Sequence, residues 1–98
     1  MITHIALFKW KNSVKKDEID KALADVANLK TKISGIIDIR CGENFSKHSK
    51  GFTHAVVVTA KNRNALQTYR EHPDHRTVAE KIDKMEEDGI GVDFETSS

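Results

Sequence analysis

The stretch ITHIALFKW, residues Ile2–Trp10, decides the fold because large apolar residues occupy both of its alternating faces. Successive side chains of a β-strand point to opposite faces of a sheet. Ala6 and Phe8 therefore share one face, whereas Ile5 and Leu7 share the other. A strand of this kind needs cover on each side. The stretch predicts a strand with helices over one face and a further layer over the other.

Helical and extended patterns alternate along the rest of the chain. Apolar residues at three- and four-residue steps predict a helix over residues 14–33. Alternating patterns predict three further strands, over residues 35–45, 52–60 and 89–95. Between the last two strands, Pro73 separates a short helix from a second helix that ends at about Met85.

The order of these elements, β-α-β-β-α-β, predicts an α+β fold: a ferredoxin-like sandwich with a four-stranded antiparallel sheet and helices on one face. In the strand over residues 35–45, Ile37, Ile39 and Cys41 share one face by parity. We expect a single domain over residues 1–98, since 98 residues leave no room for a second core. The second apolar face of the sheet needs a partner, and a symmetric copy of the chain is the simplest one. The sequence therefore predicts a homodimer whose sheets pack face to face.

The composition argues against several classes of protein. The chain has 16 basic and 15 acidic residues, a formal net charge of +1, and no basic stripe of the kind that nucleic-acid binders show. No apolar run approaches the length that crosses a membrane, and the N-terminus alternates instead of forming a signal-peptide core. A single cysteine fits a reducing compartment. We expect a cytoplasmic protein that binds neither nucleic acid nor membrane.

The segment YREHPDH, residues 69–75, combines a tyrosine, a proline and two histidines. Tyr69 follows Leu66 by one helical step, and His75 precedes Val78 by another, so both side chains are expected to face the core. An inward imidazole with the ordinary pKa of about 6.5 can take up a proton at neutral pH. Spacing alone favours structural roles, a half-buried histidine at a helix start and a core tyrosine.

His4 and His54 occupy positions of apolar parity on the first and third predicted strands. An unpaired imidazole on an apolar face is costly, so either residue alone is interpreted as a core histidine with a hydrogen-bond partner. Two such residues on neighbouring strands favour a polar spot in an apolar cavity. Small-molecule sites have this composition.

Three segments together resemble a known family: ITHIALFKWK at the start of the chain, GFTHAVVVTA in the third strand and YREHPDH at the helix break. They are similar to the stress-responsive A/B barrel (Dabb) family, which belongs to the dimeric α+β barrel superfamily. The resemblance spans residues 2–94 in element order and spacing. It implies the ferredoxin-like fold and a dimer that closes a barrel.

The resemblance also implies roles for four residues. In a plant polyketide cyclase of the family, a histidine acts as general base for an intramolecular aldol condensation and a tyrosine supports it. These catalytic roles would fall on His75 and Tyr69. Histidines on the first and third strands line that enzyme's cavity, which implies substrate-binding roles for His4 and His54.

Two classes of function remain open. The first is a protein that binds a small, partly apolar carbonyl compound, with cofactor-free cyclase or lyase activity as its enzymatic form. No cofactor is implied, because enolate chemistry needs only a base and a hydrogen-bond donor. The second is a non-catalytic stress-responsive or assembly protein that acts through its dimer. A metal site is a minor alternative, since His72, Asp74 and His75 lack convincing ligand spacing. A cavity shared by the four residues would favour the first class, and solid packing the second.

Overall fold

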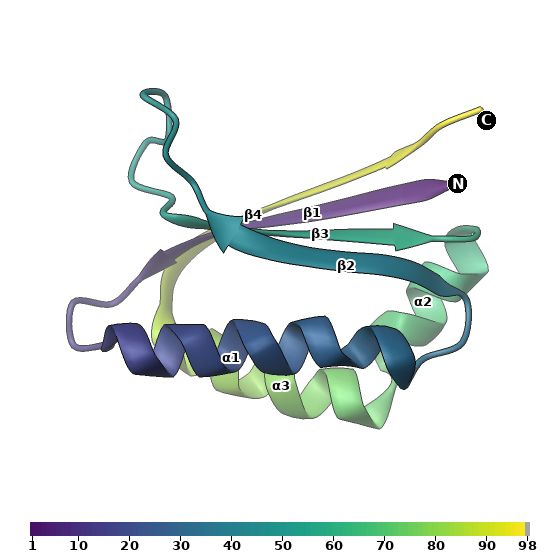
Figure 1. The fold of residues 1–98 in the computed structure, drawn as a ribbon, viewed down its shortest axis with the longest axis horizontal. Helices are drawn as coiled ribbons and strands as arrows, with labels where there is room; N and C mark the ends of the chain where they lie inside the picture. Colours follow the sequence, from purple (N-terminus) through teal and green to yellow (C-terminus); the bar gives the residue numbers. More distant parts are fainter. Residues whose placement is uncertain (98) are drawn as a thin grey trace.

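The computed structural model describes residues 1–97 as a four-stranded antiparallel sheet with helices on one side (Figure 1). The strands are β1 (Ile2–Trp10), β2 (Ile36–Glu43), β3 (His54–Ala60) and β4 (Glu86–Glu95). The helices are α1 (Lys16–Asn28), α2 (Arg63–Glu71) and α3 (Pro73–Met85), with a short 3-10 turn, Leu29–Thr31, after α1. The spatial order β2-β3-β1-β4 confirms the predicted ferredoxin-like α+β fold.

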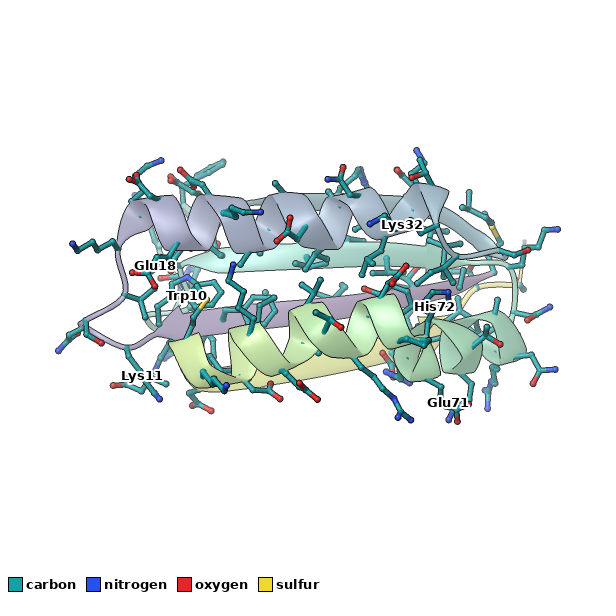
Figure 2. The ribbon with its side chains drawn as sticks, turned by 90° about the horizontal axis from the view of Figure 1, so that it is seen from below. Trp10, Lys11, Glu18, Lys32, Glu71 and His72 are labelled. Carbon is teal, nitrogen blue, oxygen red and sulfur yellow. The ribbon has the colours of Figure 1, made fainter. Side chains whose placement is uncertain are left out.

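The helices form a single layer below the sheet. Figure 2, seen from the helical side, shows α1 and α3 side by side, with β1 and β3 visible between them. Among the described residues, no helix has both the length and the apolar character needed to span a bilayer.

The predicted apolar stripe of the first helix is buried against the sheet. Ala22, Leu23 and Val26 of α1 are buried in one core with Val56 and Val58 of β3. The regular helix is shorter than residues 14–33, because the backbone tightens into the 3-10 turn after residue 28. Burial of the stripe therefore continues beyond the end of the regular helix.

A bulge at the start of β2 corrects one expectation from the sequence. Ile36 and Ile39 are buried, whereas Ile37 is 42% exposed. The pairing of β2 with β3 shifts register between Ile36 and Asp38. An inserted residue reverses the parity of the residues before it. The prediction that Ile37 shares a face with Ile39 is therefore wrong.

The face of the sheet away from the helices carries a row of apolar side chains on β4. Ile90, Val92 and Phe94 are each more than two-fifths exposed. Val92 pairs with Ile5 of β1, and Ile90 pairs with Leu7. The helices all lie on the other side of the sheet (Figure 1). Residues 1–97 supply no layer that covers this apolar face.

Helix α3 passes into β4 without a loop. Met85 ends the helix and Glu86 begins the strand, so β4 starts earlier than the predicted residue 89. The Met85 carbonyl accepts a hydrogen bond of 2.9 Å from the Lys11 amide, just beyond β1. This junction holds the C-terminal end of α3 close to the end of β1.

Candidate functional site

A cavity of about 140 Å³ lies between the sheet and the helices α1 and α3. Aliphatic side chains from β1, β3, α1 and α3 form most of its wall. Three polar side chains predicted from the sequence also line it: His4 from β1, Tyr69 from α2 and His75 from α3. The structure therefore brings three of the four predicted residues to one cavity.

The break between α2 and α3 positions Tyr69 and His75. His72 has an extended backbone (φ −62°, ψ 134°), as expected for the residue before a proline, and Pro73 begins α3. The Nδ1 atom of His72 accepts a hydrogen bond of 3.1 Å from the Asp74 amide and caps the new helix. Across this break, the ring centres of Tyr69 and His75 lie 4.4 Å apart, with 53° between the ring planes.

His75 has one ring nitrogen committed to the backbone. Its Nδ1 lies 3.1 Å from the Arg70 carbonyl oxygen. A carbonyl only accepts, so Nδ1 carries the hydrogen and donates it, and Nε2 keeps its lone pair. Burial lowers the pKa of His75 below its ordinary value of 6.5 and outweighs the hydrogen bond to the Arg70 carbonyl, which acts in the opposite direction. At neutral pH, His75 is an uncharged imidazole able to accept a proton.

Tyr69 presents a phenol to the cavity. Its side chain is 2% exposed, and burial raises its pKa to about 12. The hydroxyl therefore keeps its proton at neutral pH. Among residues 1–97, no group is hydrogen-bonded to this hydroxyl, although it is not sealed from the cavity. A buried tyrosine normally finds a partner, so this hydroxyl is a donor ready for a ligand.

His4 is held by a carboxylate on the neighbouring strand. His4 and Asp93 are paired positions of β1 and β4, and the His4 Nδ1 lies 2.5 Å from one Asp93 oxygen. The other Asp93 oxygen accepts a hydrogen bond of 2.5 Å from the Arg70 guanidinium. Burial by itself would raise the pKa of Asp93, but the hydrogen bonds from Arg70 and His4 outweigh it and hold the pKa below 3.8. This charged carboxylate fixes the His4 ring at the cavity wall.

The structure does not bring His54 to the same cavity. The Trp10 indole N–H donates to the Nδ1 of His54 at 2.9 Å, and the Thr53 hydroxyl lies 2.8 Å from the same nitrogen. The Trp10 ring also packs edge-on against the imidazole. His54 lines a separate, shallow hollow beside Cys41. Its apolar parity led to the expectation of a shared cavity, but Trp10 satisfies the imidazole instead.

Two carboxylates that the sequence did not single out line the cavity near the end of α3. They are Asp83 and Glu86. Burial raises the pKa of Glu86 above its ordinary value of 4.5, and Asp83 acts in the same direction. Helical spacing from Val78 and Ile82 could have placed Asp83 beside the apolar stripe. Among the described residues, no group of three or more histidine, cysteine or acidic side chains is arranged to hold a metal ion.

Comparison with known proteins shows relatives of the same fold and sequence pattern. A stress-response A/B barrel domain-containing protein of Arabidopsis thaliana is 33% identical over 75 residues, which cover 74% of this chain and 65% of that protein. The chain thus spans slightly less than two thirds of the length of that relative. Olivetolic acid cyclase of Cannabis sativa is 26% identical over 76 residues, covering 76% of this chain and 75% of the cyclase.

Solved structures give the same fold. A dimeric ferredoxin-like protein of unknown function from Thermobifida fusca superposes with a TM-score of 0.85 at 27% identity, covering 97% of this chain and 90% of that one. A hydroxynitrile lyase from Passiflora edulis superposes with a TM-score of 0.89 at 19% identity, covering 99% and 94%, and this likeness concerns the fold alone. The family model of the stress-responsive A/B barrel domain matches residues 2–96. The chain therefore belongs to the stress-responsive A/B barrel (Dabb) family.

Proposed function

We propose that the cavity binds a small, partly apolar carbonyl compound, with His75 as general base and Tyr69 as hydrogen-bond donor. One observation carries the proposal: an uncharged imidazole with a free Nε2 packs against the ring of Tyr69, with the two ring centres 4.4 Å apart. The Tyr69 hydroxyl has no hydrogen-bond partner among the described residues. A base beside a donor in an apolar cavity is the arrangement that proton removal next to a carbonyl requires.

In the proposed step, the Nε2 of His75 takes a proton from the carbon beside the carbonyl. The electrons of that C–H bond form a carbon–carbon double bond, and the carbonyl π electrons move to oxygen. The Tyr69 O–H donates a hydrogen bond to this developing enolate oxygen. The enolate then attacks a second carbonyl, as in a cyclase, or expels a leaving group, as in a lyase. The new oxygen or the leaving group takes the proton back from His75.

The two pKa directions suit these roles. A base must be unprotonated before it acts, and burial lowers the pKa of His75. A donor must keep its proton, and burial raises the pKa of Tyr69 to about 12. We assign His4 a positioning role, since Asp93 holds its ring at the wall of the same cavity. The similarity to olivetolic acid cyclase supports cyclase-type chemistry.

Deuterium exchange tests the proposed chemistry without knowledge of the natural substrate. Phenylacetone, a one-ring ketone, is incubated in D₂O, and loss of its methylene signal is followed by proton NMR. We expect the protein to accelerate exchange, and His75→Ala to reduce the acceleration by about 10²-fold or more. Tyr69→Phe keeps the packed ring but removes the donor, with an expected loss of about 10²-fold.

The matched control is His48→Ala, because His48 is exposed in the loop between β2 and β3. This variant should exchange phenylacetone at the wild-type rate. Full activity of His75→Ala would end the assignment of His75 as general base.

We also propose that two copies of the chain associate through the apolar face of the sheet. The exposed row Ile90, Val92 and Phe94 supports this assembly, as does the dimeric description of the Thermobifida fusca neighbour. The same face supports a second candidate function, a non-catalytic assembly role in which the cavity takes no part.

A cytoplasmic location is part of the proposal. Cys41 is a free, half-buried thiol, and burial raises its pKa. A free structural thiol of this kind is suited to a reducing compartment.

A further inference from the structure

The cavity has two distinct ends, which lie at different positions along the paired strands β1 and β4. His4 pairs with Asp93 near one end, and Trp10 pairs with Glu86 near the other. Of the β1 residues that line the cavity, His4 and Phe8 are the farthest apart, and four residue steps of strand at about 3.3 Å each place their backbones roughly 13 Å apart, a distance that the lining side chains shorten. Helix α3 runs in the same direction, from the break at His72 toward Trp10 (Figure 2). Side chains of α3 therefore reach both ends of the cavity.

Between the two ends, the wall is apolar. Ala6, Val56, Val78 and Ile82 line this middle section. A dry, apolar cavity of about 150 Å³ holds one benzene molecule. The cavity of about 140 Å³ here therefore matches a single ring with small substituents.

The first end offers hydrogen-bond donation to a ligand. The Tyr69 side chain is buried, and its hydroxyl, which makes no hydrogen bond within residues 1–97, is not fully enclosed. A ligand acceptor such as a carbonyl oxygen would satisfy it. The neighbouring guanidinium of Arg70 is already paired with Asp93 at 2.5 Å and does not line the cavity. A ligand carboxylate would therefore have to compete with Asp93 for this cation.

The second end offers hydrogen-bond acceptance. Asp83 and Glu86 line it with carboxyl groups. A ligand hydroxyl or amino group can donate to them, whereas a ligand carboxylate would add a further negative charge in a partly buried site. Burial raises the pKa of Glu86, which shows that its surroundings already disfavour negative charge.

On the basis of the proposed function, we infer the chemical class of its substrate. The cavity selects a one-ring carbonyl compound with an uncharged hydrogen-bond donor on the side of the ring opposite the carbonyl, and it rejects the corresponding carboxylic acid. The carbonyl meets Tyr69 and His75, the ring fills the aliphatic middle, and the donor faces Asp83 and Glu86.

Three ligands that share one ring and one acetyl group test this class by isothermal titration calorimetry at pH 7. They are para-aminoacetophenone, acetophenone and para-acetylbenzoate. We expect para-aminoacetophenone to bind roughly tenfold more tightly than acetophenone, since a hydrogen bond to a charged group is worth about one decade or more in affinity. We expect para-acetylbenzoate to bind at least tenfold more weakly than acetophenone.

The double variant Asp83→Asn/Glu86→Gln removes the charge at the second end and keeps the side-chain shapes. It should abolish the rejection of para-acetylbenzoate relative to acetophenone. The matched control is Glu80→Gln, an exposed position of the same helix, which should behave as wild type. Equal affinities for the three ligands in the wild type, or no binding of any of them, would overturn the inferred class.

Binding and turnover separate this inference from the proposed function. If the ligands bind in the expected order but His75→Ala exchanges phenylacetone at the wild-type rate, the ligand class stands and the chemistry falls. If exchange depends on His75 but para-acetylbenzoate binds most tightly, the chemistry stands and the ligand class falls.

Discussion

The His4 imidazole and the Asp93 carboxylate lie 2.5 Å apart at paired positions of two neighbouring strands. The same carboxylate accepts a hydrogen bond from Arg70 of α2. Asp93 thus connects β1, β4 and α2 at one point. Because Asp93 is ionised at neutral pH, its carboxylate accepts the hydrogen that the Nδ1 of His4 carries.

Replacing Asp93 by asparagine should lower the free energy of unfolding at neutral pH by about 1 kcal/mol or less, because solvent screens a side chain that is 42% exposed. The pKa of Asp93 is lowered in the folded state, so its stabilisation is present above the unfolded value of 3.8. It is lost as the pH falls through the folded-state pKa. Urea denaturation of both proteins over a pH series measures this difference.

The control for Asp93 is Asp17→Asn, at an exposed position of α1. This variant removes a carboxylate that does not touch His4 or Arg70, so its free energy of unfolding at neutral pH should stay within about 0.5 kcal/mol of wild type. A difference between wild type and Asp93→Asn that is the same at neutral and strongly acidic pH would contradict the role given to this carboxylate.

Titration of His75 should have its midpoint below the ordinary 6.5, because burial disfavours the imidazolium. The unfolded chain then binds more protons than the folded chain in the window between the folded pKa and 6.5. Stability should therefore fall as the pH drops through this window, and His75→Gln should remove that part of the decrease. The proton NMR shift of the His75 ring gives the midpoint, and exchange of phenylacetone should lose rate over the same window. A midpoint above 6.5 would be incompatible with the buried setting.

Val92→Lys should dissociate the proposed dimer. Val92 is 43% exposed in the single chain, so a lysine there leaves the fold of one chain intact and places a charge in the middle of the apolar sheet face. Sedimentation velocity at micromolar concentration should show a dimer for wild type and a monomer for the variant. The control is Phe45→Ser, since Phe45 is 98% exposed in a loop outside the sheet. A wild-type monomer, or a dimeric Val92→Lys, would exclude this face as the interface.

Gly35→Ala should destabilise the protein by about 1–3 kcal/mol. Gly35 has φ +87°, and a Cβ there would lie 2.8 Å from the Cβ of Ala65 at the start of α2. Gly42→Ala is the matched control in β2, since among the described residues, its chain neighbours aside, no heavy atom lies within 4 Å of its added Cβ, and it should change stability far less. Thermal unfolding of the two variants measures the difference, and equal melting temperatures would refute the strain at Gly35.

Local patterns were sufficient to predict the fold and the helix break. The two apolar faces of β1 and the stripe of α1 follow from spacing alone, and Pro73 begins a helix where proline chemistry places it. The extra residue in β2 is different, since nothing in the alternation around Ile37 signals a bulge. Bulges depend on pairing with a neighbouring strand, which a single sequence does not contain.

The candidate site was only partly predictable, because local spacing sets the direction of some of its side chains and strand topology sets the rest. Tyr69 and His75 face one cavity because helical spacing sets their direction. The role of Asp93 depends on β4 lying next to β1, and that adjacency comes from topology. His54 has the parity expected for a cavity, but the indole N–H of Trp10, on the neighbouring strand β1, donates a hydrogen bond to its Nδ1.

The two pairs at this cavity differ in how much of the chain must fold to make them. Tyr69 and His75 are six positions apart, so one break between two helices is enough to bring their rings into contact. His4 and Asp93 are 89 positions apart, and they meet only when opposite ends of the chain come together. Closing so long a loop costs more entropy, and contacts of this separation slow folding. Local opening of the edge strand β4 would therefore release His4 and leave Tyr69 and His75 in contact.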